Sequence, residues 1–393
     1  MKAGKVLLGI AAGASAGYLV ARSLQALREW YAPSPPRAPD GKAYARIRRS
    51  LDVVEAVRGT ATIAAFAYGR TGKRLDRVVA PAPPWLRPAL YFGSLSLATA
   101  AAELPASFVT DYTLERRFGL STQPREAWLA DYAKSAALSA AMAALVATLF
   151  GIAVRHAPRT WPWLASIGAL PLFVLGNVVV PLFVLPLFNS FEPVTGELET
   201  RLRALATRFG VGDAEILRMD MSRQTRKANA FVTGIGHTHR IVLGDTLIDA
   251  FAPEEIEFVV AHELGHYVSK DTWRLMAAGE LLVTLLFAFA SIVTPRKQAD
   301  DLRKRPLLLA HFYATILFAS QALRPLLFAF SRSREWAADR FALRATRDAA
   351  SGAAAFRRLR DRNLADADPP LWYEIFFSSH PSLRRRIEAL DMQ

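Results

Sequence analysis

The sequence predicts a mainly α-helical, polytopic membrane protein with a small α+β domain, and three observations support this fold class. The 393-residue chain is 52% hydrophobic, and its mean hydropathy is positive at +0.16. Apolar runs with few or no charges recur, and each is long enough to cross about 30 Å of hydrocarbon as a helix. So many runs would need a soluble core larger than the remaining polar residues could cover. The runs occupy residues 88–110, 135–154, 160–191, 275–295 and 306–330.

An anchor helix is predicted at the N-terminus, where two lysines precede an apolar stretch that ends at Arg22. A cleaved signal peptide has the same pattern, but a spanning helix agrees better with the other apolar runs. With this anchor, hydropathy predicts six spans. A seventh would lie at residues 52–69, where Glu55 and Arg58 interrupt the apolar pattern, because a span tolerates charges that face protein or water.

The chain divides into four predicted parts. A membrane block of about five spans comes first, a polar block follows, two further spans come next, and helices rich in arginine end the chain. Their limits are 1–190, 191–274, 275–330 and 331–393.

The polar block predicts alternating helices and strands. Residues 198–209 have helical periodicity, residues 214–221 resemble a strand, and residues 230–248 predict two short strands joined by a turn that contains glycine. Pro253 then begins a helix, and acidic side chains occupy its first turn, where the helix dipole favours them.

Composition limits the chemistry. The chain has no cysteine, which excludes disulfides and thiol catalysis and leaves histidine and carboxylate as ligands for any metal. The formal net charge is +14, and many arginines lie near the C-terminus. In a membrane protein this charge predicts contacts with anionic membrane lipids and control of topology, with no nucleic-acid partner.

His262, Glu263 and His266 form HELGH on the helix that begins at Pro253. Histidines four residues apart project from one helix face, so both can bind one Zn²⁺ while the glutamate reaches a water on it. An accidental HExxH has a chance of roughly one in 200. The alternative is a solvated helix with two surface histidines, which the mostly apolar residues 256–261 disfavour.

A third ligand is expected downstream, since catalytic zinc sites keep three protein ligands and leave a fourth position open. Glu335 is the candidate because it opens EWAAD on a helix expected after the last span. Asp339 lies four residues further on, where it could accept a hydrogen bond from a ligating histidine. Alternatively, both acids only pair with neighbouring arginines, namely Arg332, Arg334 or Arg340.

Seven motifs together resemble the type I CAAX prenyl endopeptidases, a family of multi-span zinc proteases. They are FGLSTQ (118–123), PLFNSFEPV (186–194), ANAF (228–231), RIVLGDTLI (240–248), VVAHELGHYVSKD (259–271), SREWAADRFA (333–342) and HPSLRRRI (380–387). They run in the family's order. The resemblance implies about seven transmembrane helices around an intramembrane chamber, with one Zn²⁺ per chain facing inward.

The resemblance also implies roles for single residues. The family's zinc ligands fall on His262, His266 and Glu335, and its catalytic glutamate falls on Glu263. Asn229 matches an edge-strand residue that holds the substrate backbone.

His380 and Arg386 match family residues that contact the bound peptide near the scissile bond. A cationic or hydrogen-bonding group there would stabilise the negative charge that develops on the carbonyl oxygen. From the sequence alone, His380 could instead belong to a helix cap before Pro381, and Arg386 could be an ordinary arginine of the C-terminal region.

The predicted function is that of a zinc-dependent metalloendopeptidase, which hydrolyses peptide bonds of membrane-associated proteins or peptides. The resemblance implies lipidated substrates and C-terminal CAAX-box processing. Glu263 would take a proton from water and pass it to the leaving amine, while Asp339 orients a ligand. The peptide would add as a strand along the edge that contains Asn229.

Two alternatives stay open. A membrane quality-control protease would degrade misfolded proteins at the same site, and the composition suggests a GC-rich bacterial source, where prenylated substrates need not exist. A lipid-binding or transport chamber with a structural zinc site would need a fourth protein ligand, such as His237 or His239.

The expected location is the bacterial inner membrane, with the catalytic site towards the cytoplasm. The arginines near the C-terminus support this orientation under the positive-inside rule, whereas the basic loop 295–305 opposes it.

Overall fold

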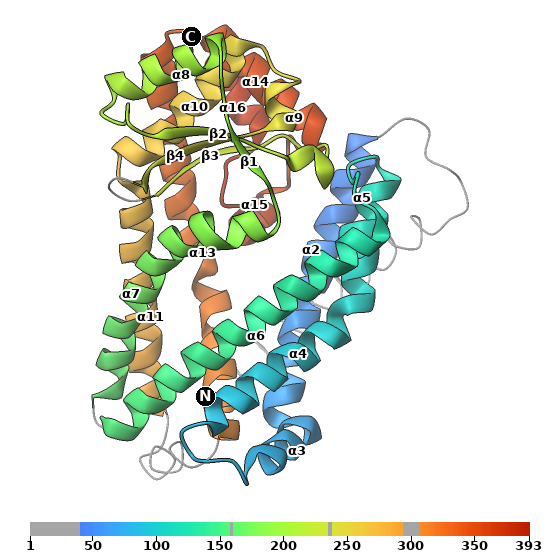
Figure 1. The fold of residues 1–393 in the computed structure, drawn as a ribbon, viewed down its shortest axis with the longest axis vertical. Coiled ribbons are helices and arrows are strands. Elements are labelled where there is room, and N and C mark those ends of the chain that lie inside the picture. The colour runs from blue at the N-terminus through green and yellow to red at the C-terminus, as the bar shows by residue number, and fades with distance from the viewer. Residues whose placement is uncertain (1–39, 158–159, 235–237, 294–305) are drawn as a thin grey trace, which may run out of the picture.

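The computed structural model describes residues 40–157, 160–234, 238–293 and 306–393. A small sheet and several short helices gather at one end, which holds the C-terminus, and long helices extend away from it (Figure 1). The predicted N-terminal anchor and the basic loop 295–305 lie outside the described residues.

Four segments of the described chain are long and apolar enough to cross a membrane, and a fifth arises if one pair bent by 41° counts as one span. The five apolar runs predicted above fall in these helices, so the mainly α, polytopic fold is confirmed. The helices are α4 (Arg87–Ser107) with η1 (Phe108–Thr113) and α5 (Leu114–Arg117), α6 (Arg125–His156), the bent pair of α7 (Trp161–Val179) with η2 (Val180–Val184) and η3 (Leu185–Leu187), α11 (Asp271–Val293) and α13 (Pro306–Thr346).

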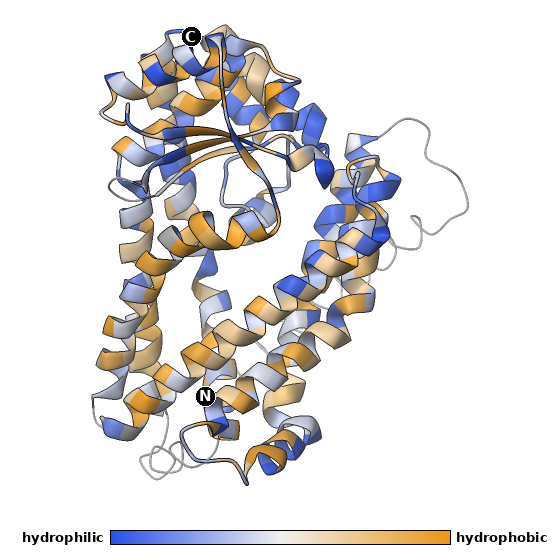
Figure 2. Ribbon diagram, in the orientation of Figure 1, coloured by the Kyte–Doolittle hydropathy of each residue, from blue (hydrophilic) through white to orange (hydrophobic). Residues whose placement is uncertain are grey.

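These helices expose the apolar side chains that a bilayer would cover. Figure 2 shows hydrophobic residues along the long helices, and α6, α7 and α11 leave large ones open, including Leu149, Ile167 and Leu281. Inside, aromatic rings from four helices contact one another with centroid distances of 5.0 to 6.2 Å. These rings belong to Phe150, Trp161, Phe287 and Phe312.

Residues 52–69 belong mostly to helix α2 (Gly41–Tyr68), which precedes α3 (Arg70–Val79). α2 is not among the described helices apolar enough to be candidate spans. Its charged groups pair inside the protein, with Arg58 Nε 2.5 Å from Glu103 of α4, and with Glu55 3.7 Å from Arg48. A protein-facing wall accepts these charges, and the crossing of the membrane by α2 stays a prediction.

The four-stranded sheet has the order β1-β2-β4-β3. β2 pairs with β4 in parallel, and both outer pairs are antiparallel, which leaves β3 at an edge. The central strand β4 is almost fully buried, as its run of Ile, Val and Leu predicts. The strands are β1 (Phe191–Pro193), β2 (Glu215–Met219), β3 (Ala230–Thr233) and β4 (Arg240–Gly244).

Short helices cover this sheet and share its core. α10 supplies the buried side chains Ile256, Phe258, Val260 and Leu264, and α14 adds Phe356. The predicted helix 198–209, the strand 214–221 and the Pro253 start are confirmed within a residue or two, whereas the second strand of 230–248 ends at Gly244, where α9 begins. The helices are α8 (Glu197–Arg208), η4 (Met221–Arg223), α9 (Asp245–Ile248), α10 (Pro253–Val268), α14 (Ala349–Asn363), α15 (Leu371–Phe377) and α16 (Leu383–Asp391).

The last span and the predicted helix of Glu335 form one continuous helix, α13. The sequence analysis expected that helix after the last span, as a separate element. Instead the helix continues from the apolar part into the core beneath the sheet, where Ala338 and Ala342 are buried. The single helix α13 therefore joins the membrane part to the polar part.

Candidate active site

The HELGH segment lies on α10, whose start and end are well defined. Pro253 occupies its first turn, and the Glu255 carboxylate accepts a hydrogen bond from the Ala252 N–H at 2.8 Å. Helical spacing brings the His262 and His266 Nε2 atoms to 3.2 Å from each other. His262 is 7% exposed, so the alternative of two solvated surface histidines does not hold.

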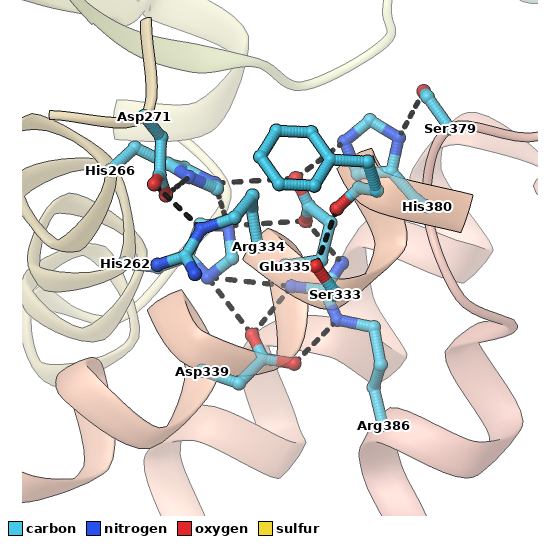
Figure 3. Close-up of polar contacts among 11 residues, drawn as sticks. His262, His266, Asp271, Ser333, Arg334, Glu335, Asp339, Ser379, His380 and Arg386 are labelled. Atoms are coloured by element: carbon cyan, nitrogen blue, oxygen red, sulfur yellow. Dashed lines mark hydrogen bonds and ion pairs between the residues drawn. The ribbon is translucent and has the colours of Figure 1, made fainter. Parts of the chain in front are cut away.

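Glu335 of α13 faces this pair (Figure 3). Its carboxylate oxygens lie 3.4 Å from His262 Nε2 and 3.2 Å from His266 Nε2. The helices approach closely at Gly265, where an added Cβ would lie 3.2 Å from the Ala338 Cα. Ligand atoms from His262, His266 and Glu335 all lie within 4.8 Å of one another.

These residues fit a divalent metal. Two imidazoles and one carboxylate are a donor set that zinc uses. Glu335 Oε2 is buried and has no hydrogen-bond partner within the described chain, as expected of an oxygen that binds a cation. Burial lowers the pKa of His262, but the carboxylates of Asp339 and Glu335 outweigh it and raise that pKa to about 9. The electrostatics of the site therefore favour a positive charge between these groups.

Asp339 contacts the second ring nitrogen of His262, since its Oδ1 lies 2.9 Å from His262 Nδ1. Arg386 of α16 in turn binds both oxygens of Asp339, through Nε at 2.8 Å and Nη2 at 2.6 Å. The guanidinium is buried and stacks over the Phe356 ring at 4.2 Å. Arg386 is therefore a fixed part of the site rather than an ordinary arginine of the C-terminal region, and its Nη1 lies 3.5 Å from Glu335.

Asp271 holds His266 in the same way, and the sequence analysis missed it. Its Oδ2 lies 3.0 Å from His266 Nδ1, and its Oδ1 accepts a hydrogen bond from Arg334 Nε at 2.7 Å. Asp271 is only 1% exposed, and it follows Lys270, whose φ of 55° turns the chain out of α10. The rule that each ligating histidine donates its second N–H to a carboxylate was the signal that could have found it.

Two of the three arginines that could have paired with Glu335, Arg332 and Arg334, have other partners. Arg334 binds Asp271, and Arg332 Nη1 donates to two carbonyls next to and within α15, those of Glu374 and Ser378, each at 2.9 Å. The charged-face alternative for Glu335 is therefore not what the structure has.

His380 lies on the loop between α15 and α16, and Figure 3 shows its ring beside Glu335. Its Nε2 is 3.4 Å from Glu335 Oε1, while Ser379 Oγ is 2.9 Å from its Nδ1. The His380 side chain is 60% exposed, in contrast to the buried Arg386. It can therefore reach an incoming molecule without a rearrangement of the core.

Glu263 and Asn229 form no hydrogen bond or ion pair with this cluster within the residues that the structure describes. The surroundings nevertheless shift the pKa of the Glu263 carboxyl: removal from water raises it, and the two histidines act against that rise. Asn229 is exposed directly before β3, and its carbonyl accepts a hydrogen bond from the Gly244 N–H at 2.9 Å. It thus lies at the start of the edge strand, as predicted.

A helical membrane fold that carries a His-His-Glu group beside a small sheet defines an integral-membrane metalloprotease. Family comparison agrees over nearly the whole chain. Residues 193–393 match the model of peptidase family M48, and residues 39–190 match the CAAX prenyl protease N-terminal region, described as five membrane helices. The chain belongs to peptidase family M48.

Two relatives align with this chain over most of their own length. The uncharacterized metalloprotease YhfN of Bacillus subtilis is 30% identical over 76% of this chain and 72% of that protein. CAAX prenyl protease 1 of Saccharomyces cerevisiae is 29% identical over 77% of this chain and 71% of that protein. The crystal structure of Saccharomyces mikatae Ste24p matches with a TM-score of 0.79 at 22% identity, over 96% of each chain, which shows a common fold.

Proposed function

We propose that the chain is a zinc-dependent endopeptidase that hydrolyses peptide bonds of membrane-associated proteins, including C-terminal CAAX-box processing, with one Zn²⁺ per chain. The observation that carries the proposal is the convergence of His262, His266 and Glu335 from two helices onto one point. The names of the CAAX prenyl protease relatives support the substrate class.

His262, His266 and Glu335 would hold Zn²⁺, which when bound would supply Lewis acidity towards the scissile carbonyl and water. Glu263 would accept a proton from the attacking water and pass it to the leaving amine. Removal from water raises the pKa of the Glu263 carboxyl. A raised pKa suits both steps, because the carboxylate then takes the proton from water more readily and its acid form can still give the proton to the amine. Asp339 and Asp271 keep the second nitrogens of the two histidines protonated, so that both Nε2 atoms stay free to ligate.

His380 and Arg386 would stabilise negative charge at different places in the site. Arg386 commits Nε and Nη2 to Asp339, which leaves Nη1 for a charge near Glu335. His380 is exposed and can donate a hydrogen bond from Nε2 to the carbonyl oxygen as negative charge develops on it. The peptide would pair with the edge of β3 next to Asn229.

A Glu263→Gln variant tests the chemistry. We expect full zinc content and a loss of cleavage of roughly a hundredfold to ten-thousandfold, because only the proton carrier is removed. Zinc is measured by elemental analysis, and cleavage by mass spectrometry of the products. Parent-like activity in this variant would remove Glu263 from the mechanism.

Three substrates separate the possible physiological roles. A prenylated CAAX peptide, its unprenylated form and an unfolded membrane protein are offered to the purified chain. Preference for the first supports CAAX processing of lipidated substrates, and preference for the third supports a quality-control protease.

The alternative of a structural zinc site needs a fourth protein ligand. Among the described residues the metal-binding group contains three, and His239, whose ring contacts Tyr267, is not one of them. His237 lies outside the described residues. A fourth position left open, as it is among the described residues, would favour catalysis over a purely structural role.

The proposed location is the bacterial inner membrane, with contacts to anionic lipids and the site towards the cytoplasm. Arginines of α14 and α16, at the end with the site, support this orientation. The basic helix α3 lies at the opposite end of the molecule and opposes it (Figure 1), so the orientation needs a direct measurement.

A further inference from the structure

We propose that Asn363 is the positioning residue that ends the substrate-binding edge of β3 at Ala228, and so fixes which bond of a docked peptide meets the metal ligands. The inference rests on the proposed function and deepens it, because it concerns how the same site selects the bond. It comes from the hydrogen bonds of the residues around Ala228 and from the alternation of the strand that follows.

The ladder between β3 and β4 fixes which backbone groups face the open edge. Ala230 pairs with Leu243, and the Gly244 N–H donates to the Asn229 carbonyl at 2.9 Å. In an antiparallel ladder, residues alternate between those that bond the partner strand and those that face away. Asn229, Phe231 and Thr233 therefore bond inward.

The residues between them face the open edge instead, namely Ala228, Ala230 and Val232. Lys227 agrees with this alternation, since its carbonyl turns inward and accepts a hydrogen bond from Thr246 Oγ1 at 2.8 Å. The free edge would thus start at Ala228 if nothing covered it.

The side chain of Asn363 covers that first position. The Ala228 N–H donates to Asn363 Oδ1 at 2.8 Å, and Asn363 Nδ2 donates to the Ala228 carbonyl at 3.1 Å. A residue of an added strand would make the same two bonds, so the amide of Asn363 takes the place of one residue of a docked peptide. Asn363 is the last residue of α14, 135 positions away in sequence.

The residues before Ala228 are also hydrogen-bonded to other parts of the fold, so a docked peptide cannot extend its pairing past Ala228. The Arg226 N–H donates to the Leu120 carbonyl at 2.8 Å, and Thr225 Oγ1 donates to the same oxygen at 3.0 Å. Every residue from Thr225 to Ala228 is therefore tied to another part of the fold, the first two of them to the same carbonyl. A docked peptide can pair outward with Ala230 and Val232, and it must leave the edge where Asn363 begins.

A fixed end of the edge sets the register of the peptide. A strand that slips by one residue turns every side chain to the other face, so slippage occurs in steps of two residues. Removal of the Asn363 amide frees the outward groups of Ala228 and opens one such step. The scissile bond would then move by two residues.

The test compares Asn363→Ala, Asn363→Asp and the exposed control Arg362→Ala with the parent chain. Each full-length protein, with zinc bound, is given the CAAX peptide that the parent cleaves, and the products are identified by mass spectrometry. Hydrogen–deuterium exchange over Ala228 and the zinc content are measured in parallel.

We expect Asn363→Ala to keep zinc, to exchange the Ala228 amide faster, and to cut at a second bond two residues away. The preference for the parent bond should fall about tenfold, as the loss of two neutral hydrogen bonds implies. Asn363→Asp keeps the acceptor for the Ala228 N–H and should give fewer shifted products, and Arg362→Ala should give the parent pattern.

A single parent bond in folded Asn363→Ala would overturn the inference while leaving the proposed function intact. If that variant does not fold, Asn363→Asp decides, since a parent pattern there overturns the inference and shifted products support it. Absence of any cleavage by the parent would instead reject the proposed function.

Discussion

The two histidines of HELGH each have a carboxylate of their own. Asp339 reaches His262 from α13, and Asp271 reaches His266 from the start of α11. Both acids are bound in turn by an arginine, which fixes their position. The orientation of the ligands therefore depends on residues that contribute no ligand atom.

Asp271→Asn should weaken zinc binding about tenfold to a hundredfold, because the neutral amide holds the His266 tautomer less firmly. Competition with a chelator measures the affinity. The surface acid Asp249, whose side chain is 62% exposed, provides the control Asp249→Asn, which should bind zinc as the parent does. Equal affinities in the two variants would contradict a role for Asp271 in the metal site.

Arg386→Met should lower the free energy of unfolding by about 3–5 kcal/mol, because it leaves the buried Asp339 carboxylate without its partner. Denaturant titration of the detergent-solubilised protein measures this loss. His380→Ala removes an exposed side chain and should change stability by no more than about 0.5 kcal/mol. If both variants were equally stable, the bidentate pair would not be structural.

Local sequence predicted the ligands and the supporting acid Asp339, but not Asp271 or Asn363. HELGH and EWAAD carry their spacing within one helix each, so helical geometry was enough to place them. Asp271 follows a chain reversal at Lys270, and Asn363 meets a partner 135 positions away. No periodicity links such residues, and only the folded chain brings them together.

Among the elements, the crossing of α10 and α13 decides whether the metal ligands meet. Gly265 allows the approach, since a Cβ there would lie 3.1 Å from a Phe341 ring atom and 3.2 Å from the Ala338 Cα. The position between the two histidines is thus a packing position as well as a part of the motif.

Gly265→Ala should cost about 1–3 kcal/mol of stability and weaken zinc binding, because the added methyl group pushes Glu335 away from the histidines. Thermal unfolding and chelator competition measure the two effects. Gly279→Ala is the matched control, since no atom lies within 4 Å of the added Cβ on α11. A Gly265 variant that behaves like the control would show that the crossing tolerates a wider spacing.

Helix prediction succeeded where hydropathy was uniform. The runs in α4, α6, α7, α11 and α13 were found, but the helix of Glu335 was expected as a separate element, whereas α13 is continuous. In α2 the charges Glu55 and Arg58 pair within the protein, a contact that hydropathy cannot register. Burial of these charges by protein rather than by lipid is what hydropathy alone does not show.

At the scale of the whole molecule, the absence of cysteine makes the membrane orientation directly measurable. Met392→Cys lies near the site end and is 79% exposed in the parent, while Arg74→Cys lies on α3 at the opposite end. With the site towards the cytoplasm, a membrane-impermeant maleimide should label only the cysteine at position 74 in intact cells, and both after permeabilisation. The reversed pattern would place the site outside.

The continuous helix α13 has a consequence for the order of events during synthesis. It spans about 60 Å at 1.5 Å per residue, and it carries an apolar segment before Glu335. The histidine pair precedes Glu335 in the chain, so we expect Glu335 to join it only after α13 has inserted into the bilayer. Stable zinc binding should therefore require membrane insertion. Chains translated without membranes should release zinc to a chelator, and chains translated into lipid nanodiscs should retain it. Equal retention in both would refute this order.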